Sequence, residues 1–276
     1  MDVEPLSICH GSWSAGLGHH DGRLSVRWLR RGDVDLLGPE GCPLIGPWFG
    51  RLRDHRIAFD GVTVDLDPGD PRIDHDDLGR PLHGLRTGPD DWHLFSPDPS
   101  RALASSTELS GPAFPFPHEI SVEVALTAAG LEVTTTLTPT GSRAVPVAFG
   151  WHPYLVAGGA DPERWSVHLP FERQVVLADL LATSQTASAD LVEDIVRPRD
   201  DCFFAREGDT ARIEGPTSAT AIELTSGYGW AMVWSPEGAG FICVEPMAGP
   251  LLALEEPSEA IVVSPGESFR CSFRIH

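Results

Sequence analysis

One histidine in this sequence has an unusually stiff and aromatic setting. His152 lies between Trp151 and Pro153 in the stretch Phe149–Leu155, directly after a strand-like run. Proline has a fixed φ angle and biases the preceding residue towards an extended backbone, so rigid backbone presents this histidine. Imidazole acts as general acid or base near neutral pH, and Trp151 and Tyr154 add flat faces with polar edges. A structural histidine in an aromatic core is the competing interpretation.

A carboxylate closes an apolar strand in the stretch Ile242–Met247. Strand alternation places Cys243 and Glu245 on one face and the neighbouring Ile242 and Val244 on the other. A carboxylate after so apolar a run is either exposed at the edge of a sheet or buried. Burial would raise the pKa of Glu245 towards that of a useful general base.

Three further clusters carry polar side chains that could hold a ligand. Gly50–Ile57 contains three arginines and a histidine, which could bind hydroxyls or a phosphate. For Arg51 and Arg53 a solvated charged turn is the favoured interpretation. Pro81–Arg86 presents a histidine beside a glycine, and Arg199–Phe204 places two acids before an aromatic pair. Each cluster is a weak signal by itself.

The charge and composition exclude several classes of function. The net charge of −20 argues against nucleic acid and anionic membrane surfaces, which both require basic patches. All 20 basic residues are arginine. The absence of lysine excludes Schiff-base chemistry, a pyridoxal-phosphate lysine and a phosphate-loop lysine.

The five cysteines are scattered and show no Cys-x-x-Cys spacing, so neither a zinc site nor a disulfide framework is expected. No basic and apolar leader opens the sequence, and no apolar run is long and clean enough to span a membrane. We therefore expect a cytoplasmic protein with no metal, no cofactor, no nucleic-acid partner and no membrane contact, either a monomer or a homodimer.

Nearly every segment with a clear apolar pattern has the two-residue period of a β-strand. Ile120–Leu137 reads as two alternating strands around Gly130, and Arg56–Leu66 as a hairpin that turns at Asp60-Gly61. Further short strands are predicted at Leu24–Leu29, Ser166–Leu169, Ala221–Leu224, Trp230–Trp234, Phe241–Val244, Ile261–Val263 and Phe269–Ile275. Ala178–Val196 is interpreted as mostly loop. The pattern predicts an all-β protein, a large antiparallel β-sandwich in which residues 1–276 form one domain.

Taken in order, these stretches resemble the aldose 1-epimerases, or galactose mutarotases, over about residues 46–273. Five motifs carry the resemblance: Gly50–Ile57 is similar to the family's Gly-Arg…Asn-Arg-Ile segment, Leu82–Gly84 to Leu-His-Gly, Gly150–Tyr154 to Gly-x-His-x-Tyr, Asp200–Phe203 to Asp-x-x-Phe, and Glu245-Pro246 to Glu-Pro/Gln. Each motif alone is weak, whereas all five in one order on an all-β background form a strong match.

The resemblance implies a carbohydrate-binding isomerase of carbohydrate metabolism that interconverts α and β anomers without a cofactor. Glu245 is then the catalytic base and His152 the catalytic acid. The predicted substrate-binding residues are Arg56, His83, Asp200, Trp151 and Arg86. Asp201 competes with Asp200, because it has the same spacing to Phe204 as Asp200 has to Phe203.

Two departures from the family pattern leave the substrate open. His55 stands where asparagine is usual, and Leu85-Arg86 follows His83-Gly84 where galactose-type enzymes have a second glycine. A His-Gly-x-x-Arg run is typical of the related hexose-6-phosphate 1-epimerases, whereas here the arginine comes one residue earlier. The alternatives to an epimerase for a free aldose are therefore an epimerase for a phosphorylated hexose, with Arg53, Arg56 or Arg86 on the phosphate, and a non-catalytic sugar-binding protein on the same fold.

Overall fold

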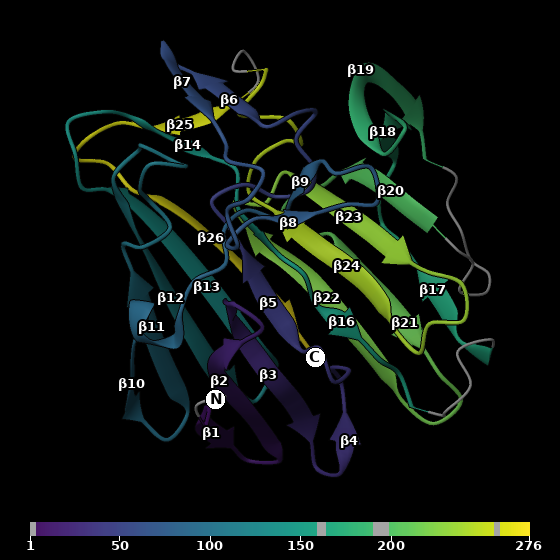
Figure 1. The fold of residues 1–276 in the computed structure, drawn as a ribbon. Helices are drawn as coiled ribbons and strands as arrows, with labels where there is room; N and C mark the ends of the chain where they lie inside the picture. The colour runs from purple at the N-terminus through teal and green to yellow at the C-terminus, as the bar shows by residue number, and fades with distance from the viewer. Residues whose placement is uncertain (1–3, 159–163, 190–198, 257–259) are drawn as a thin grey trace.

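The architecture is a sandwich of two large antiparallel sheets, with three short two-stranded ribbons at their margins (Figure 1). The computed structural model describes residues 4–158, 164–189, 199–256 and 260–276. The only helical element named in these ranges is one 3-10 turn, η1 (Pro89–Asp91). This is the all-β fold that the period-2 runs predict. No helix in these ranges has the length and apolar character needed to cross a membrane.

The larger sheet has twelve strands and runs in the order β1-β2-β3-β5-β15-β24-β23-β20-β18-β19, with β4 paired to β3 and β16 paired to β24. Its strands are β1 (Leu6–His10), β2 (Trp13–His20), β3 (Arg23–Arg31), β4 (Val34–Asp35), β5 (Cys42–Ile45), β15 (Gly150–Trp151), β16 (Tyr154–Leu155), β18 (Arg173–Ala178), β19 (Leu181–Ser188), β20 (Arg199–Phe204), β23 (Trp230–Ser235) and β24 (Ile242–Met247).

The second sheet has eight strands in the order β10-β11-β12-β13-β26-β22-β21-β17. Its strands are β10 (His93–Asp98), β11 (Arg101–Ser106), β12 (His118–Thr127), β13 (Gly130–Pro139), β17 (Ser166–His168), β21 (Thr210–Glu214), β22 (Ala219–Ser226) and β26 (Phe269–Ile275). The ribbons are β6 (Arg56–Phe59) with β7 (Val62–Asp65), β8 (Asp74–His75) with β9 (Pro81–Leu82), and β14 (Val145–Val147) with β25 (Ile261–Val263).

The main core lies between the two sheets, because strand alternation turns one apolar face of each sheet inward. Along β12, Ile120, Val122, Val124 and Leu126 are all at most 3% exposed, and β12 pairs with β13 in the predicted hairpin. The hairpin that turns at Asp60-Gly61 is present as β6–β7. Both predictions are confirmed.

The larger sheet also carries apolar side chains on its opposite face. Ile45, Phe49, Cys202, Met232 and Met247 form a second, smaller buried cluster. Neighbouring positions on the same strands, such as Val233 and Val244, belong to the main core instead. This opposite face of the central strands is where the candidate site lies.

The loop prediction for Ala178–Val196 is wrong over its first half. Leu181–Ser188 forms β19, which pairs with β18 at the end of the larger sheet. Because β19 is an edge strand, no residue in it is fully buried, so the apolar alternation that reveals a half-buried strand is missing. Residues 190–196 lie outside the described ranges.

Candidate active site

The register of four antiparallel strands sets the candidate side chains in two adjacent rows on the face opposite the core. Directly opposed residues in antiparallel strands point to the same side of the sheet. The first row crosses β20, β23, β24 and β16 and contains Asp200, Trp234, Cys243 and Tyr154. The second row contains Cys202, Met232 and Glu245. The register therefore brings Asp200, and not Asp201, to the same face as Glu245.

His152 reaches this face because β15 is inserted between β5 and β24. The backbone of Gly150 passes so closely that an added Cβ would lie 2.6 Å from both the Phe49 ring and the Pro246 carbonyl oxygen, so only glycine fits. Beyond it, the His152 amide donates a hydrogen bond of 2.9 Å to the Pro43 carbonyl. The close packing at Gly150 and the hydrogen bond of the His152 amide thus fix the backbone that the sequence predicts to be stiff.

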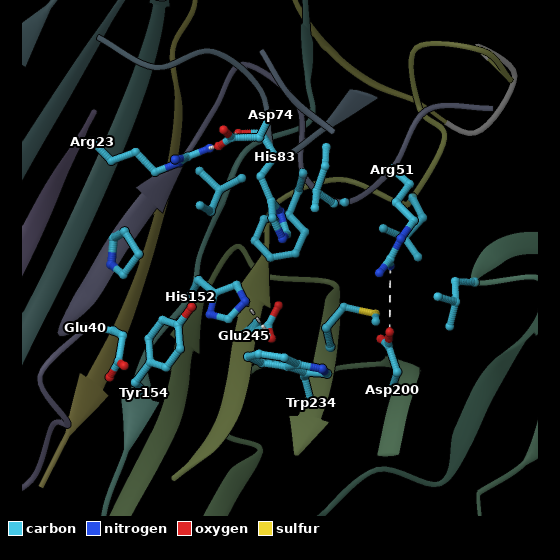
Figure 2. A pocket seen from close by; sticks show the side chains of 18 of the residues that line it. Arg23, Glu40, Arg51, Asp74, His83, His152, Tyr154, Asp200, Trp234 and Glu245 are labelled. Atoms are coloured by element: carbon cyan, nitrogen blue, oxygen red, sulfur yellow. Dashed lines mark hydrogen bonds and ion pairs between the residues drawn. The ribbon is translucent and has the colours of Figure 1, made fainter. Parts of the chain in front are cut away.

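The two expected proton-transfer groups face each other. His152 Nε2 lies 3.3 Å from Glu245 Oε1, and the residues are 6% and 2% exposed. The His152 ring stacks on Tyr154 at a centroid distance of 4.7 Å. It meets the edge of Trp234 at 5.7 Å. These contacts fix the plane of the imidazole and leave the pair at the floor of a cavity (Figure 2).

Burial favours the uncharged form of both members of this pair. It raises the pKa of Glu245 well above its ordinary value, with the Asp200 charge adding to the effect and Arg51 opposing it. Burial also lowers the pKa of His152 to about 3. Both shifts act in the same direction: they favour a protonated Glu245 carboxyl next to a neutral imidazole over an ion pair of the two groups.

A second histidine approaches the pair from above the sheet. His83 has a positive φ of 58°, and its amide donates to the Gly50 carbonyl at 2.9 Å. A Cβ on the following Gly84 would lie 2.0 Å from the Gly46 carbonyl oxygen, so this turn requires glycine. The His83 and His152 rings meet edge to face at 5.4 Å. Burial, followed by the nearby charges of His152 and Arg23, lowers the pKa of His83 well below its usual value.

An arginine and an aspartate flank the pair on the other side. Arg51 Nη1 lies 3.7 Å from Asp200 Oδ2, and Arg51 Nε lies 3.3 Å from Asp76. Asp76 is 8% exposed and also binds Arg80 at 2.6 Å. Two carboxylates thus orient the Arg51 guanidinium over the sheet. Burial raises the pKa of Asp200, and the Arg51 charge opposes that rise.

These groups line one cavity of about 390 Å³, within the range of about 300–1,000 Å³ that small-molecule sites occupy. In Figure 2 Arg23 and Asp74 lie at one end, Arg51 and Asp200 at the other, with the histidines and Glu245 between them. Arg23 is held by Asp74 at 2.9 Å and by the His83 carbonyl at 3.0 Å.

Three predicted binding residues lie elsewhere. Arg56 starts β6, has a side chain 61% exposed and faces Asp65 at 3.9 Å, so it does not line the cavity. Arg86 donates hydrogen bonds of 2.8 Å to both Asp74 and Asp21, and it does not line the cavity. Trp151 is fully buried in the main core, where its indole donates to Thr135, because alternation turns it to the opposite side from Gly150 and His152.

The cavity also contains side chains that the sequence did not single out as binding residues. The sequence favours a solvated turn for Arg51, places Trp234 only within a predicted strand, and gives no signal for Arg23, which lies just before the predicted strand Leu24–Leu29. The local sequence around Arg51 does little to distinguish it from the neighbouring arginines. The signal that distinguishes Arg51 is its pairing with Asp200, which is 149 positions away along the chain.

The described residues contain one group with metal-ligand geometry. His152, Cys243 and Glu245 offer ligand atoms that all lie within 4.8 Å of one another. Burial raises the pKa of the Cys243 thiol well above its ordinary value, which disfavours the thiolate that a metal requires. The same imidazole and carboxyl form a complete proton-transfer pair without a metal.

Comparisons with known proteins identify the family and the fold. The family model for aldose 1-epimerase matches residues 28–276. "Uncharacterized protein YihR" of Escherichia coli K12 is 25% identical over 262 residues, which cover 86% of this chain and 81% of that protein.

Solved structures share the fold. A galactose mutarotase related enzyme from Lactobacillus acidophilus superposes with a TM-score of 0.79 at 14% identity, covering 98% of this chain and 96% of that one. A galactose mutarotase-like protein from Clostridium acetobutylicum gives a TM-score of 0.78 at 17% identity, covering 98% and 94%. With the family model matching nearly the whole sequence, the chain belongs to the aldose 1-epimerase family.

Proposed function

We propose that the protein is a cofactor-independent aldose 1-epimerase that interconverts the α and β anomers of a free aldose. One observation carries this proposal: a buried imidazole and a buried carboxyl lie 3.3 Å apart on the floor of a cavity of sugar-binding size. A non-catalytic sugar-binding protein would need hydrogen-bonding groups, but it would not need two groups that can exchange a proton there.

The reaction requires one proton donor and one proton acceptor. Glu245 takes the proton from the C1 hydroxyl, the C1–O5 bond breaks as the aldehyde forms, and His152 gives a proton to O5. Rotation about C1–C2 then presents the other face of the aldehyde. The O5 hydroxyl adds to that face while the two residues exchange roles, which leaves the enzyme in its starting state.

The burial of the pair sets the order of proton transfer. Burial raises the pKa of Glu245 and lowers that of His152, which favours Glu245 as the first acid and neutral His152 as the first base. Hydrogen bonds from sugar hydroxyls to the Glu245 carboxylate would favour its charged form. Glu245 would then act first as the base and His152 as the acid. Either order uses the same single proton, so the chemistry depends on the pair rather than on one assignment.

The remaining polar groups are suited to holding hydroxyls. Arg51 and Asp200 offer donors and acceptors on one side of the pair, and His83 lies above it. Arginine is too basic to give up its proton, and we assign Arg51 to binding in place of Arg56. Flat faces were expected from Trp151 and Tyr154; Tyr154 lines the cavity, and Trp234 lines it where Trp151 does not.

The charges favour a free aldose over a phosphorylated one. Arg53, Arg56 and Arg86 are absent from the cavity lining, and Arg53 pairs with Glu255 and Glu256 instead. Two arginines and five acids line the cavity: Arg23, Arg51, Asp21, Glu40, Asp74, Asp200 and Glu245. Both arginines already face a carboxylate, so a dianionic phosphate would enter a site with excess negative charge.

NMR exchange spectroscopy between anomeric protons tests the proposal directly. Free aldoses and their 6-phosphates are compared at equal concentration, with wild-type protein and His152→Asn in parallel. We expect exchange above the spontaneous rate for at least one free aldose and a large loss in the variant. Faster exchange for the 6-phosphates would support the phosphorylated alternative, and no acceleration of any aldose would refute the enzyme assignment.

A further inference from the structure

One side of the cavity is apolar and has no part in the proposed proton transfer. Leu180, Leu181 and Ala182 from the β18–β19 hairpin line it, together with Leu251 and Leu252. We call these five residues the apolar wall. The hairpin follows β20 in the sheet order, so its three wall residues lie on the far side of Asp200 from Glu245, whereas Leu251 packs against the smaller buried cluster of the larger sheet. The opposite end holds the charged Arg23 and Asp74 (Figure 2).

Leu180 occupies an uncommon position for a leucine. Asp179 and Leu180 form the two-residue connection between β18 and β19, with φ angles of 49° and 64°. Such turns favour Asn-Gly, because both central residues need a positive φ. Leu180 is also 42% exposed, one of few large hydrophobic side chains in the described residues with that much exposure. An apolar ligand group in the cavity would offset the cost of exposing this side chain.

The hairpin that carries three of the wall residues is held in place by two arginines. Arg80 donates from Nη1 to the Asp179 carbonyl at 2.8 Å, and Asp76 holds the Arg80 guanidinium from below. Arg53 donates to the Ala182 carbonyl at 3.4 Å. A surface held in place before the ligand arrives loses little freedom on binding. The wall is therefore suited to select among ligands.

We propose that the apolar wall selects aldoses that carry a methyl group in place of the C6 hydroxymethyl. This inference rests on the proposed function and narrows its substrate class. The wall side chains offer no hydrogen-bonding atom, so a hydroxyl that faces them loses its water partners and gains none. A methyl group there is removed from water at no such cost.

Matched sugar pairs that differ only at C6 provide the test: D-fucose with D-galactose, D-quinovose with D-glucose, and L-rhamnose with L-mannose. Anomer exchange gives kcat/KM, and isothermal titration calorimetry gives Kd for the same sugars. We expect the deoxy member of at least one pair to be favoured by about 10- to 100-fold, the range for one hydroxyl against an apolar pocket. The preference should appear in Kd as well as in kcat/KM.

Two variants locate the source of the preference. Leu180→Gly removes the side chain at a position whose φ glycine adopts freely, so folding should be retained, and the deoxy preference should shrink. Leu78→Gly is the matched control, because Leu78 is 73% exposed and does not line the cavity. It should leave the preference unchanged. Thermal unfolding of both variants shows that they are folded.

The outcomes separate this inference from the proposed function. If the hydroxymethyl member binds and reacts as well as the deoxy member in every pair, the wall inference is overturned while the epimerase stands. An unchanged preference in Leu180→Gly would overturn it too. A deoxy preference in Kd without any acceleration of exchange would support the wall and refute the epimerase, and no binding of any sugar would overturn both.

Discussion

Replacing Glu245 by glutamine should slow the enzyme and stabilise the protein at the same time. Glutamine has nearly the same size and keeps a hydrogen-bonding group towards His152, but it cannot exchange a proton. General acid–base assistance is typically worth about 10²–10⁴-fold in rate, so kcat for anomer exchange should fall by about that factor. Sugar binding, measured by calorimetry, should be affected far less.

The effect on stability follows from the burial of this carboxyl, which is 2% exposed and whose pKa is raised well above its ordinary value. Below the ordinary glutamate pKa of about 4.3, folded and unfolded states are both protonated and Glu245 makes no pH-dependent contribution to stability. As pH rises, the unfolded chain releases this proton while the folded protein keeps it, so the free energy of unfolding falls until pH passes the folded pKa. Glutamine has no such dependence.

Each pKa unit by which burial raises the folded pKa of Glu245 should lower the free energy of unfolding at higher pH by about 1.4 kcal/mol. For a chain of about 150–250 residues each kcal/mol corresponds to about 2–4 °C in Tm, and this chain is slightly longer. Tm of wild type and Glu245→Gln should therefore agree near pH 4 and separate by several degrees near pH 7, with the variant higher.

Asp201→Asn is the matched control, since Asp201 lies one residue beyond the cavity aspartate and pairs with Arg199 on the other side of β20. It should keep both the rate and its pH dependence of Tm close to wild type. Wild-type exchange in Glu245→Gln would refute the catalytic role. A Tm difference that does not change with pH would refute the reasoning about burial.

Three further predictions concern the same site. Arg51→Ala should lower kcat/KM by about 10- to 100-fold, equivalent to the roughly 1.5–3 kcal/mol of a hydrogen bond to a charged group, whereas Arg56→Ala should leave steady-state kinetics unchanged; equal losses would contradict the placement of Arg51. The acid limb of the pH–rate profile should lie well below the ordinary histidine pKa of about 6.5, because burial lowers the pKa of His152 to about 3; a limb near 6.5 that His152→Asn removes would contradict this. Activity should survive dialysis against EDTA, since the proton-transfer pair is complete without a metal; loss that zinc restores would instead assign a metal to His152, Cys243 and Glu245.

Local sequence patterns account for the fold class, whereas the resemblance to the family singled out the candidate proton-transfer pair. Period-2 alternation is a property of neighbouring residues, so the hairpins β6–β7 and β12–β13 could be predicted from their own stretches. The same alternation placed Cys243 and Glu245 on one face of β24 and turned Ile242 and Val244 into the core. The edge strand β19 escaped prediction because it buries little.

The choice among similar residues was decided only by tertiary structure. Asp200 and Asp201 have the same local spacing, yet the register of β20 against β23 turns only Asp200 towards Glu245. Arg51 and Arg56 occur in one short segment, but only Arg51 meets Asp76 and Asp200. Trp151 lies next to His152 and still enters the core. In each case the deciding contact joins residues far apart in the chain, and sheet order and register determine such contacts where local spacing cannot.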